Sequence, residues 1–163
     1  MPFVYNSQSA VLGAGSLATS GSANTEIEHS FHKPGTRNIG IQALYVGGKG
    51  AGLTALSGIA YRMIKWTTTS AAGGTSVTPT PRDVGMQAAK ATAAMSSAGV
   101  TAGTGGPLFL GGCVSGAAGP GGWVAPNPDS LPTLEGSDNK SIGVRSASGT
   151  ASLNFELNIE HVE

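Results

Sequence analysis

Ser152-Leu-Asn-Phe-Glu-Leu-Asn-Ile-Glu-His161 is the stretch that decides the fold. Apolar residues occupy every second position from Leu153 to Ile159, and asparagine and glutamate occupy the positions between them. Because successive side chains of a β-strand point to opposite faces, this alternation predicts a strand with one dry face and one wet face.

A second alternating segment lies just before this strand. Ile142 and Val144 alternate with smaller or polar residues, and Ala147-Ser148-Gly149 supplies a turn sequence. Two alternating segments joined by a glycine-containing turn are typical of a β-hairpin. We therefore expect residues 142–145 and 153–159 to pair with each other in an antiparallel sheet.

The rest of the chain has the composition of a β protein with long glycine-rich loops. The 163 residues include 26 glycines and 9 prolines, and only 11% of them are charged. Roughly eight short apolar or β-branched segments are separated by Gly, Pro and Asn. This spacing predicts an all-β fold, an antiparallel β-sandwich of jelly-roll-like type with little or no helix.

One segment leaves the choice between strand and helix open. Asp83 to Ala98 is rich in alanine and methionine, which favours a helix. However, glycine or proline bounds the segment on both sides, and residues 91–95 also fit a strand of small residues. We favour the strand.

The first 23 residues are expected to form an N-terminal arm or extended segment, and residues 24–163 a single β domain. Phe3, Val4 and Tyr5 form a short apolar group, and the residues after them are mostly Ser, Gly and Ala. A frayed terminus is the alternative to an arm that lies on a partner. No basic residue precedes Lys33, so we expect synthesis in the cytoplasm without export.

Charge and cysteine content exclude several classes of function. Nine basic residues balance nine acidic ones, so the sequence lacks the electrostatic signature of a protein that binds nucleic acid or an anionic membrane. No apolar run has the length of a membrane span. Cys113 is the only cysteine; it forms no internal disulfide and is expected to be a small buried apolar residue.

The glycine-rich segment from Val46 to Thr54 resembles a phosphate-binding loop only superficially. In such a loop a lysine stands directly before Ser or Thr, whereas Gly50 follows Lys49 here. We expect a loop between two antiparallel strands, with Lys49 as a candidate partner contact.

Two of the three histidines lie close together in the sequence, at positions 29 and 32. Residues three apart on a regular strand point to opposite faces, so His29 and His32 are not expected to share a metal ion, and His161 would join them only through the fold. We predict no metal, no cofactor and no catalytic residue. A Ser-His-Asp site dispersed over the chain stays an alternative, although no nucleophile-elbow sequence supports it.

Trp123 stands alone in a Gly/Pro-rich loop. It either fills one end of its own core or anchors a partner, because aromatic residues dominate buried contact centres. We favour the first role and keep Trp123 as a candidate contact residue.

Several segments between residues 40 and 160 resemble small head-decoration (cement) proteins and related accessory virion proteins of tailed bacteriophages. The segments that carry this resemblance are Tyr61-Arg-Met-Ile-Lys-Trp66, Thr78-Pro-Thr-Pro-Arg-Asp83, Thr101-Ala-Gly-Thr-Gly-Gly-Pro107, Gly119-Pro-Gly-Gly-Trp-Val-Ala-Pro-Asn-Pro-Asp129 and Ser146-Ala-Ser-Gly-Thr-Ala-Ser-Leu-Asn-Phe155.

The resemblance implies a non-enzymatic structural protein of the virion. Its partners would be the major capsid protein, on the outer face of the capsid lattice, and further copies of itself, most simply as a homotrimer. The candidate contact residues are Phe3, Val4, Tyr5, Lys49 and Trp123. The alternatives are a receptor- or glycan-binding module of a phage fibre or tail, and a hydrolytic enzyme with a dispersed site.

Overall fold

A computed structural model describes most of the chain. The described residues are 3–9, 17–18, 26–48, 58–96, 99–106, 108–115, 121–136, 139–148 and 154–163. Lys49, Leu153 and most of the glycine-rich segment 46–54 lie outside these ranges, as do residues 1–2, 10–16 and 19–23 of the expected arm.

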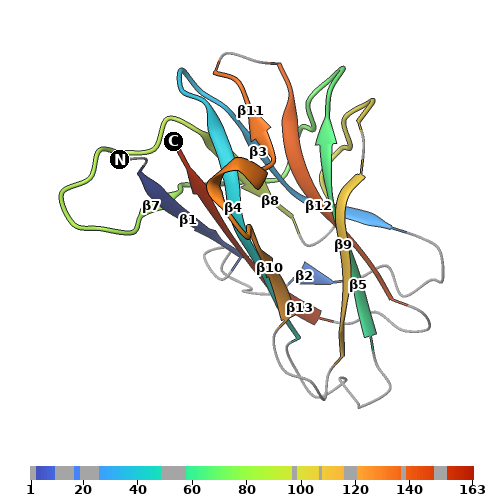
Figure 1. Cartoon of the computed structure of the whole chain (residues 1–163). Helices are drawn as coiled ribbons and strands as arrows, with labels where there is room; N and C mark the ends of the chain where they lie inside the picture. Colours follow the sequence, from blue (N-terminus) through green and yellow to red (C-terminus); the bar gives the residue numbers. More distant parts are fainter. Residues whose placement is uncertain are drawn as a thin grey trace.

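Within the described ranges, thirteen strands form two antiparallel sheets that lie one upon the other (Figure 1). The first sheet has the strand order β10-β4-β13-β1-β7, with β11 paired to β4 and β2 paired to β13. The second sheet has the order β6-β8-β3-β12-β5-β9. The bounds are β1 Val4–Gln8, β2 Leu17–Ala18, β3 Ile27–Lys33, β4 Ile39–Gly48, β5 Gly58–Trp66, β6 Thr75–Val77, β7 Thr80–Pro81, β8 Thr92–Met95, β9 Leu108–Ser115, β10 Gly121–Val124, β11 Thr133–Leu134, β12 Ser141–Ser148 and β13 Asn154–Val162.

The predicted all-β sandwich is confirmed, and its connectivity is that of a jelly roll. Eight strands make up this jelly roll: β1-β13-β4-β10 in the first sheet and β3-β12-β5-β9 in the second. In chain order these eight strands alternate between the two sheets, except that β5 and β9 both belong to the second sheet. The long connection between β5 and β9 adds β6 and β8 beside β3 and adds β7 beside β1. No α-helix occurs in the described ranges; one 3-10 turn spans Pro128–Ser130.

The alternation in the C-terminal strand is confirmed, but the predicted hairpin is wrong. In β13 the side chains of Phe155, Leu157 and Ile159 are buried, and those between them are more exposed. However, β13 pairs with β1 and β4, whereas β12 pairs with β3 and β5 in the other sheet. Two strands with one apolar face each can bury those faces side by side in one sheet or opposite each other in two sheets. The alternation of residues is the same in both arrangements, so it does not distinguish a hairpin from strands of different sheets.

Val4–Gln8 does not form an arm. This segment is β1 and pairs with β13 along its whole length, from Val4 opposite Val162 to Gln8 opposite Asn158. The side chain of Tyr5 is fully buried. These residues are therefore extended, which is one of the two forms expected for the N-terminal stretch, and they supply the hydrogen-bonded neighbour on this edge of β13.

The strand interpretation of residues 91–95 is confirmed for Thr92–Met95. This segment is β8 and pairs with both β3 and β6. Its small residues suit a position between two other strands, and no helix forms elsewhere between Asp83 and Ser96. Tertiary pairing outweighs the helix propensity of alanine here.

The protein has a main core between the sheets and a smaller cluster on the outer face of the second sheet. The smaller cluster includes Phe31, Ile64 and Trp66 from the strands, and Ala71 and Val100 from the connection between β5 and β9. Backbone hydrogen bonds between residues 67–72 and 101–105 hold this covering layer together. Part of this outer face, over Phe31, Ile64 and Trp66, is thus covered by the chain itself.

Replacement of Phe155 by alanine should destabilise the protein by about 3–5 kcal/mol, since it removes a fully buried aromatic ring from the main core. Denaturant unfolding measures this change. Asn154→Ala, on the exposed side of the same strand, is the control and should change the stability by less than about 0.5 kcal/mol. A loss below about 1 kcal/mol for Phe155→Ala would contradict the assigned face.

Candidate functional site: a contact loop and an open sheet face

All three histidines are buried in the core, which the sequence did not predict. The pairing of β3 with β12 shifts register between Val144 and Arg145, so that one extra residue of β3, His29, lies between Glu28 and Ser30. This bulge places both His29 and His32 toward the first sheet. His29 contacts Phe155 edge to face with ring centroids 5.0 Å apart, and His32 contacts His161 at 5.5 Å. The expectation that they face opposite sides is wrong.

Burial keeps these imidazoles neutral. Loss of hydration lowers the pKa of His29 to about 4 and that of His32 to about 3, and the nearby His161 adds to the effect on His32. Burial also lowers the pKa of His161, although the carboxylate of Glu163 opposes the shift. Both ring nitrogens of His32 lack a hydrogen-bond partner among the described residues.

His29 and Ser146 form a hydrogen bond of 2.7 Å between Nε2 and Oγ, which resembles the base and nucleophile of a hydrolase. Both residues are almost completely buried, and a pKa of about 4 makes His29 a weak base near pH 7. Neither the burial nor the low pKa suits a catalytic base and nucleophile. No group of three or more potential metal ligands is assembled within the described part of the chain.

The outer face of the second sheet carries a buried carboxylate. The side chain of Glu28 is only 4% exposed. Its carboxylate accepts a hydrogen bond of 2.7 Å from Trp66 Nε1 and another of 2.9 Å from Arg145 Nε. The Arg145 guanidinium also lies 4.7 Å from the Trp66 ring centroid. Gly143 leaves the space for the carboxylate, since a Cβ there would collide with Glu28 Oε1. Burial raises the pKa of Glu28, while Arg145 and Trp66 oppose the shift.

The outer face of the first sheet is open by comparison. The strand register sets Tyr45 of β4 beside Asn158 of β13, and Asn158 beside Gln8 of β1. Tyr45 is 39% exposed, and Val124 of the neighbouring strand β10 is 54% exposed. This face carries amide, carboxylate and apolar side chains that contact solvent.

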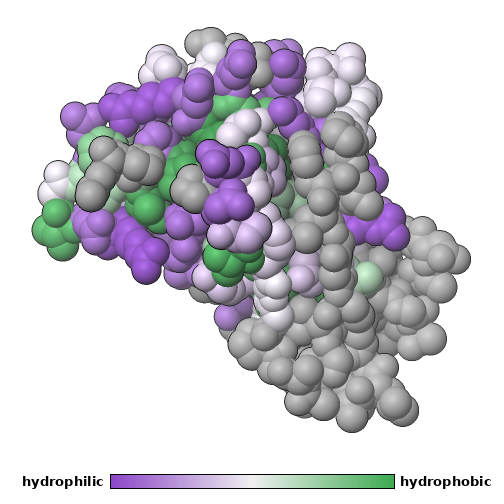
Figure 2. All heavy atoms as spheres, viewed as in Figure 1, coloured by the Kyte–Doolittle hydropathy of each residue, from purple (hydrophilic) through white to green (hydrophobic). Residues whose placement is uncertain are grey.

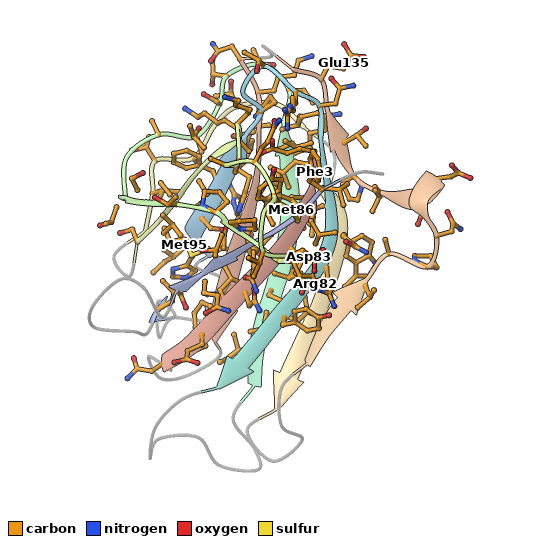
Figure 3. The ribbon with its side chains drawn as sticks, turned by 90° about the vertical axis from the view of Figure 1, so that its left-hand side faces the viewer. Phe3, Arg82, Asp83, Met86, Met95 and Glu135 are labelled. Atoms are coloured by element: carbon orange, nitrogen blue, oxygen red, sulfur yellow. The ribbon has the colours of Figure 1, made fainter. Side chains whose placement is uncertain are left out.

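A second exposed feature is the 82–90 loop, which we define as Arg82 to Lys90, between β7 and β8. Its Val84 is fully exposed. The loop projects at the left of Figure 1, and Figure 2 shows a hydrophobic patch at the same extremity. The loop faces the viewer in Figure 3, where Arg82, Asp83 and Met86 are labelled.

Hydrogen bonds fix the base of the 82–90 loop on the domain. The Tyr5 hydroxyl donates to the Gln87 carbonyl oxygen at 2.9 Å, and Arg37 Nη2 donates to Gln87 Oε1 at 2.6 Å. The backbone nitrogens of Lys90 and Ala91 donate to the buried carboxylate of Glu163 at 2.8–2.9 Å. The Arg82 nitrogen donates to the Val4 carbonyl oxygen at 2.9 Å. The loop therefore presents Val84 on a fixed base.

The structure brings three of the five candidate contact residues to this base. Tyr5 is buried, and its hydroxyl binds the Gln87 carbonyl oxygen. Phe3 is partly buried, and the Arg37 guanidinium lies 6.0 Å from its ring centroid. The Val4 carbonyl oxygen accepts the hydrogen bond from the Arg82 backbone nitrogen. Trp123 lies apart from them on β10, at the opposite edge of the first sheet, where it is partly buried and packs against the main core.

Sequence reasoning missed Val84 and Gln87. The available signal was a single apolar residue in Arg82-Asp-Val-Gly85, directly after a proline. Gly85 adopts a positive φ of 90°, as expected at the turn of such a loop.

No protein-family model matches the chain, and neither the curated proteins nor the solved structures contain a significant match. Across the described segments, no helix is long and apolar enough to cross a membrane.

The buried histidines make the stability depend on pH. Their pKa values are lower in the folded state than the ordinary 6.5, so the unfolded chain binds protons first as the pH falls. The free energy of unfolding should drop by about 1.4 kcal/mol per pH unit per histidine below about pH 6.5. Urea unfolding at a series of pH values measures this slope, and His32→Gln should reduce it. Equal stability at about pH 7.5 and about pH 5 would exclude neutral burial.

Tyr5→Phe should loosen the 82–90 loop, because it removes the hydroxyl that binds Gln87. Loss of one such bond costs about 0.5–1.5 kcal/mol, so trypsin should cleave after Arg82 or Lys90 roughly two- to tenfold faster. Tyr45→Phe is the matched control, since Tyr45 lies on the open sheet face away from the loop. Unchanged cleavage of Tyr5→Phe would show that this bond does not fix the loop.

Proposed function

We propose that the chain is a structural protein of a virion, a decoration protein that binds the outer face of the major capsid lattice and stabilises it. The observation that carries this proposal is the 82–90 loop, in which a fully exposed valine is held on a fixed base. The resemblance to head-decoration proteins and the small, weakly charged β-sandwich support the same role.

A fixed loop suits this role because less conformational freedom is lost on binding. An exposed apolar side chain that enters a pocket of the partner gains about 1.5–3 kcal/mol from burial. Asp83 directly precedes Val84 and supplies a charged rim beside the apolar contact.

The protein would act as a multimer, most simply a homotrimer. One small loop supplies modest affinity, but several linked copies on a repeating lattice bind together, so their effects combine. Neighbouring capsid subunits would thereby be connected.

Sedimentation of the purified protein tests the oligomeric state, and its copy number relative to the shell protein in purified particles tests the virion role. A few copies per particle would instead favour a fibre or tail component.

Val84→Ser should weaken co-sedimentation with capsids that lack the protein by roughly tenfold or more per site, because it removes the apolar contact. Val124→Ser is the matched control, as Val124 is also exposed but lies on β10 at the other edge of the first sheet. Thermal unfolding should be nearly unchanged for both variants. Full binding by Val84→Ser would overturn the assigned contact.

A further inference from the structure

The open face of the first sheet contains a groove that the capsid role does not use. Two hollows of about 360 and 240 Å³ both border Gln8 and so adjoin each other. The larger hollow lies at the low end of the range of small-ligand sites, which is about 300–1,000 Å³, and the smaller one lies below it. Beyond Gln8, the residues that matter for recognition are Asn6, Pro81, Arg82 and Glu160 in the larger hollow and Tyr45, Glu156 and Asn158 in the smaller one.

The register explains how side chains from four strands line one groove. Tyr45, Asn158 and Gln8 form one row across β4, β13 and β1, and the next row contains Glu160, Asn6 and Thr80 of β13, β1 and β7. Neighbouring strands are about 4.8 Å apart, so the groove extends about 14 Å from β4 to β7.

We propose that this groove binds a neutral oligosaccharide. Each amide side chain offers both a donor and an acceptor, which matches the paired donor and acceptor capacity of sugar hydroxyls. Tyr45 presents a half-exposed ring at one end, and Pro81 and Val4 present apolar surface at the other. These surfaces suit the C–H faces of a sugar ring.

Two amide oxygens in the groove are unsatisfied. Oδ1 of Asn6 and Oδ1 of Asn158 are buried, and no described residue donates a hydrogen bond to either. The terminal torsion of an asparagine side chain has a broad energy minimum, so each amide can rotate its oxygen toward the groove. This rotation breaks no hydrogen bond to the oxygen, because the oxygen accepts none from the described residues. A ligand hydroxyl would supply the missing donor.

The charges of the groove favour a neutral ligand. Among the described lining residues the only cation is Arg82, and it already lies 3.9 Å from the carboxylate of Glu160. A phosphate, sulfate or acidic sugar would have to compete with Glu160 for Arg82.

The same two glutamates are too far apart to hydrolyse the sugar as a pair. They are four residues apart on β13, so their Cα atoms are separated by about 13 Å, and both side chains stand roughly perpendicular to the sheet. Glycosidase carboxyl pairs lie about 5–9.5 Å apart. The groove is a binding site without this chemistry.

Saturation-transfer NMR on the full chain tests the proposal with cellotriose, maltotriose, mannotriose and chitotriose, and with a sulfated heparin oligosaccharide as the anionic comparison. At least one neutral trisaccharide should bind, and Asn158→Ala and Tyr45→Ala should each weaken it by roughly tenfold. Asn154→Ala, on the same face of β13 but outside both hollows, should bind normally.

Three results would overturn the proposal: no neutral trisaccharide binds more tightly than about 10 mM, the anionic oligosaccharide binds most tightly, or the groove variants bind as well as the native chain. The proposal is independent of the capsid role. Asn158→Ala should still co-sediment with capsids, and Val84→Ser should still bind the sugar, so failure of one proposal is distinguishable from failure of the other.

Discussion

Burial of one face of β13 against the second sheet is the constraint on which the structure depends. Phe155, Leu157 and Ile159 supply a continuous apolar stripe, and the strand carrying them is paired on both edges, with β4 on one side and β1 and β2 on the other. Because β13 is central, the first residues of the chain are required beside the last ones. The base of the 82–90 loop is built on this junction.

The core combines this apolar stripe with an unusual number of polar groups. His29, His32 and His161 lie in the interior beside serine side chains, and the protein avoids an isolated buried charge by keeping the imidazoles neutral. Glu28 represents the opposite solution, since an arginine and an indole nitrogen bind its buried carboxylate. The His29–Ser146 bond and the bonds of Glu28 to Trp66 and Arg145 each connect strands that are far apart in the chain.

The two outer faces of the sandwich differ, and this difference separates structure from recognition. Part of the outer face of the second sheet is covered by the connection between β5 and β9, which forms a small apolar cluster with it. The first sheet presents Tyr45, Gln8 and Asn158 to solvent, and the 82–90 loop projects beside it. The same long connection therefore covers part of one sheet and provides the proposed contact loop of the other.

The sequence by itself determined the strand class of the fold and the buried face of β13, because side-chain alternation is a local property that each strand carries in its own residues. Only the tertiary structure decided that β12 and β13 lie in different sheets, that Val4–Gln8 completes the first sheet, and that a bulge turns His29 into the core. It also decided which loop is tied down by Tyr5 and Arg37. These features depend on which strands become neighbours, and that choice is made by the total area buried and the hydrogen bonds satisfied between segments far apart in the chain.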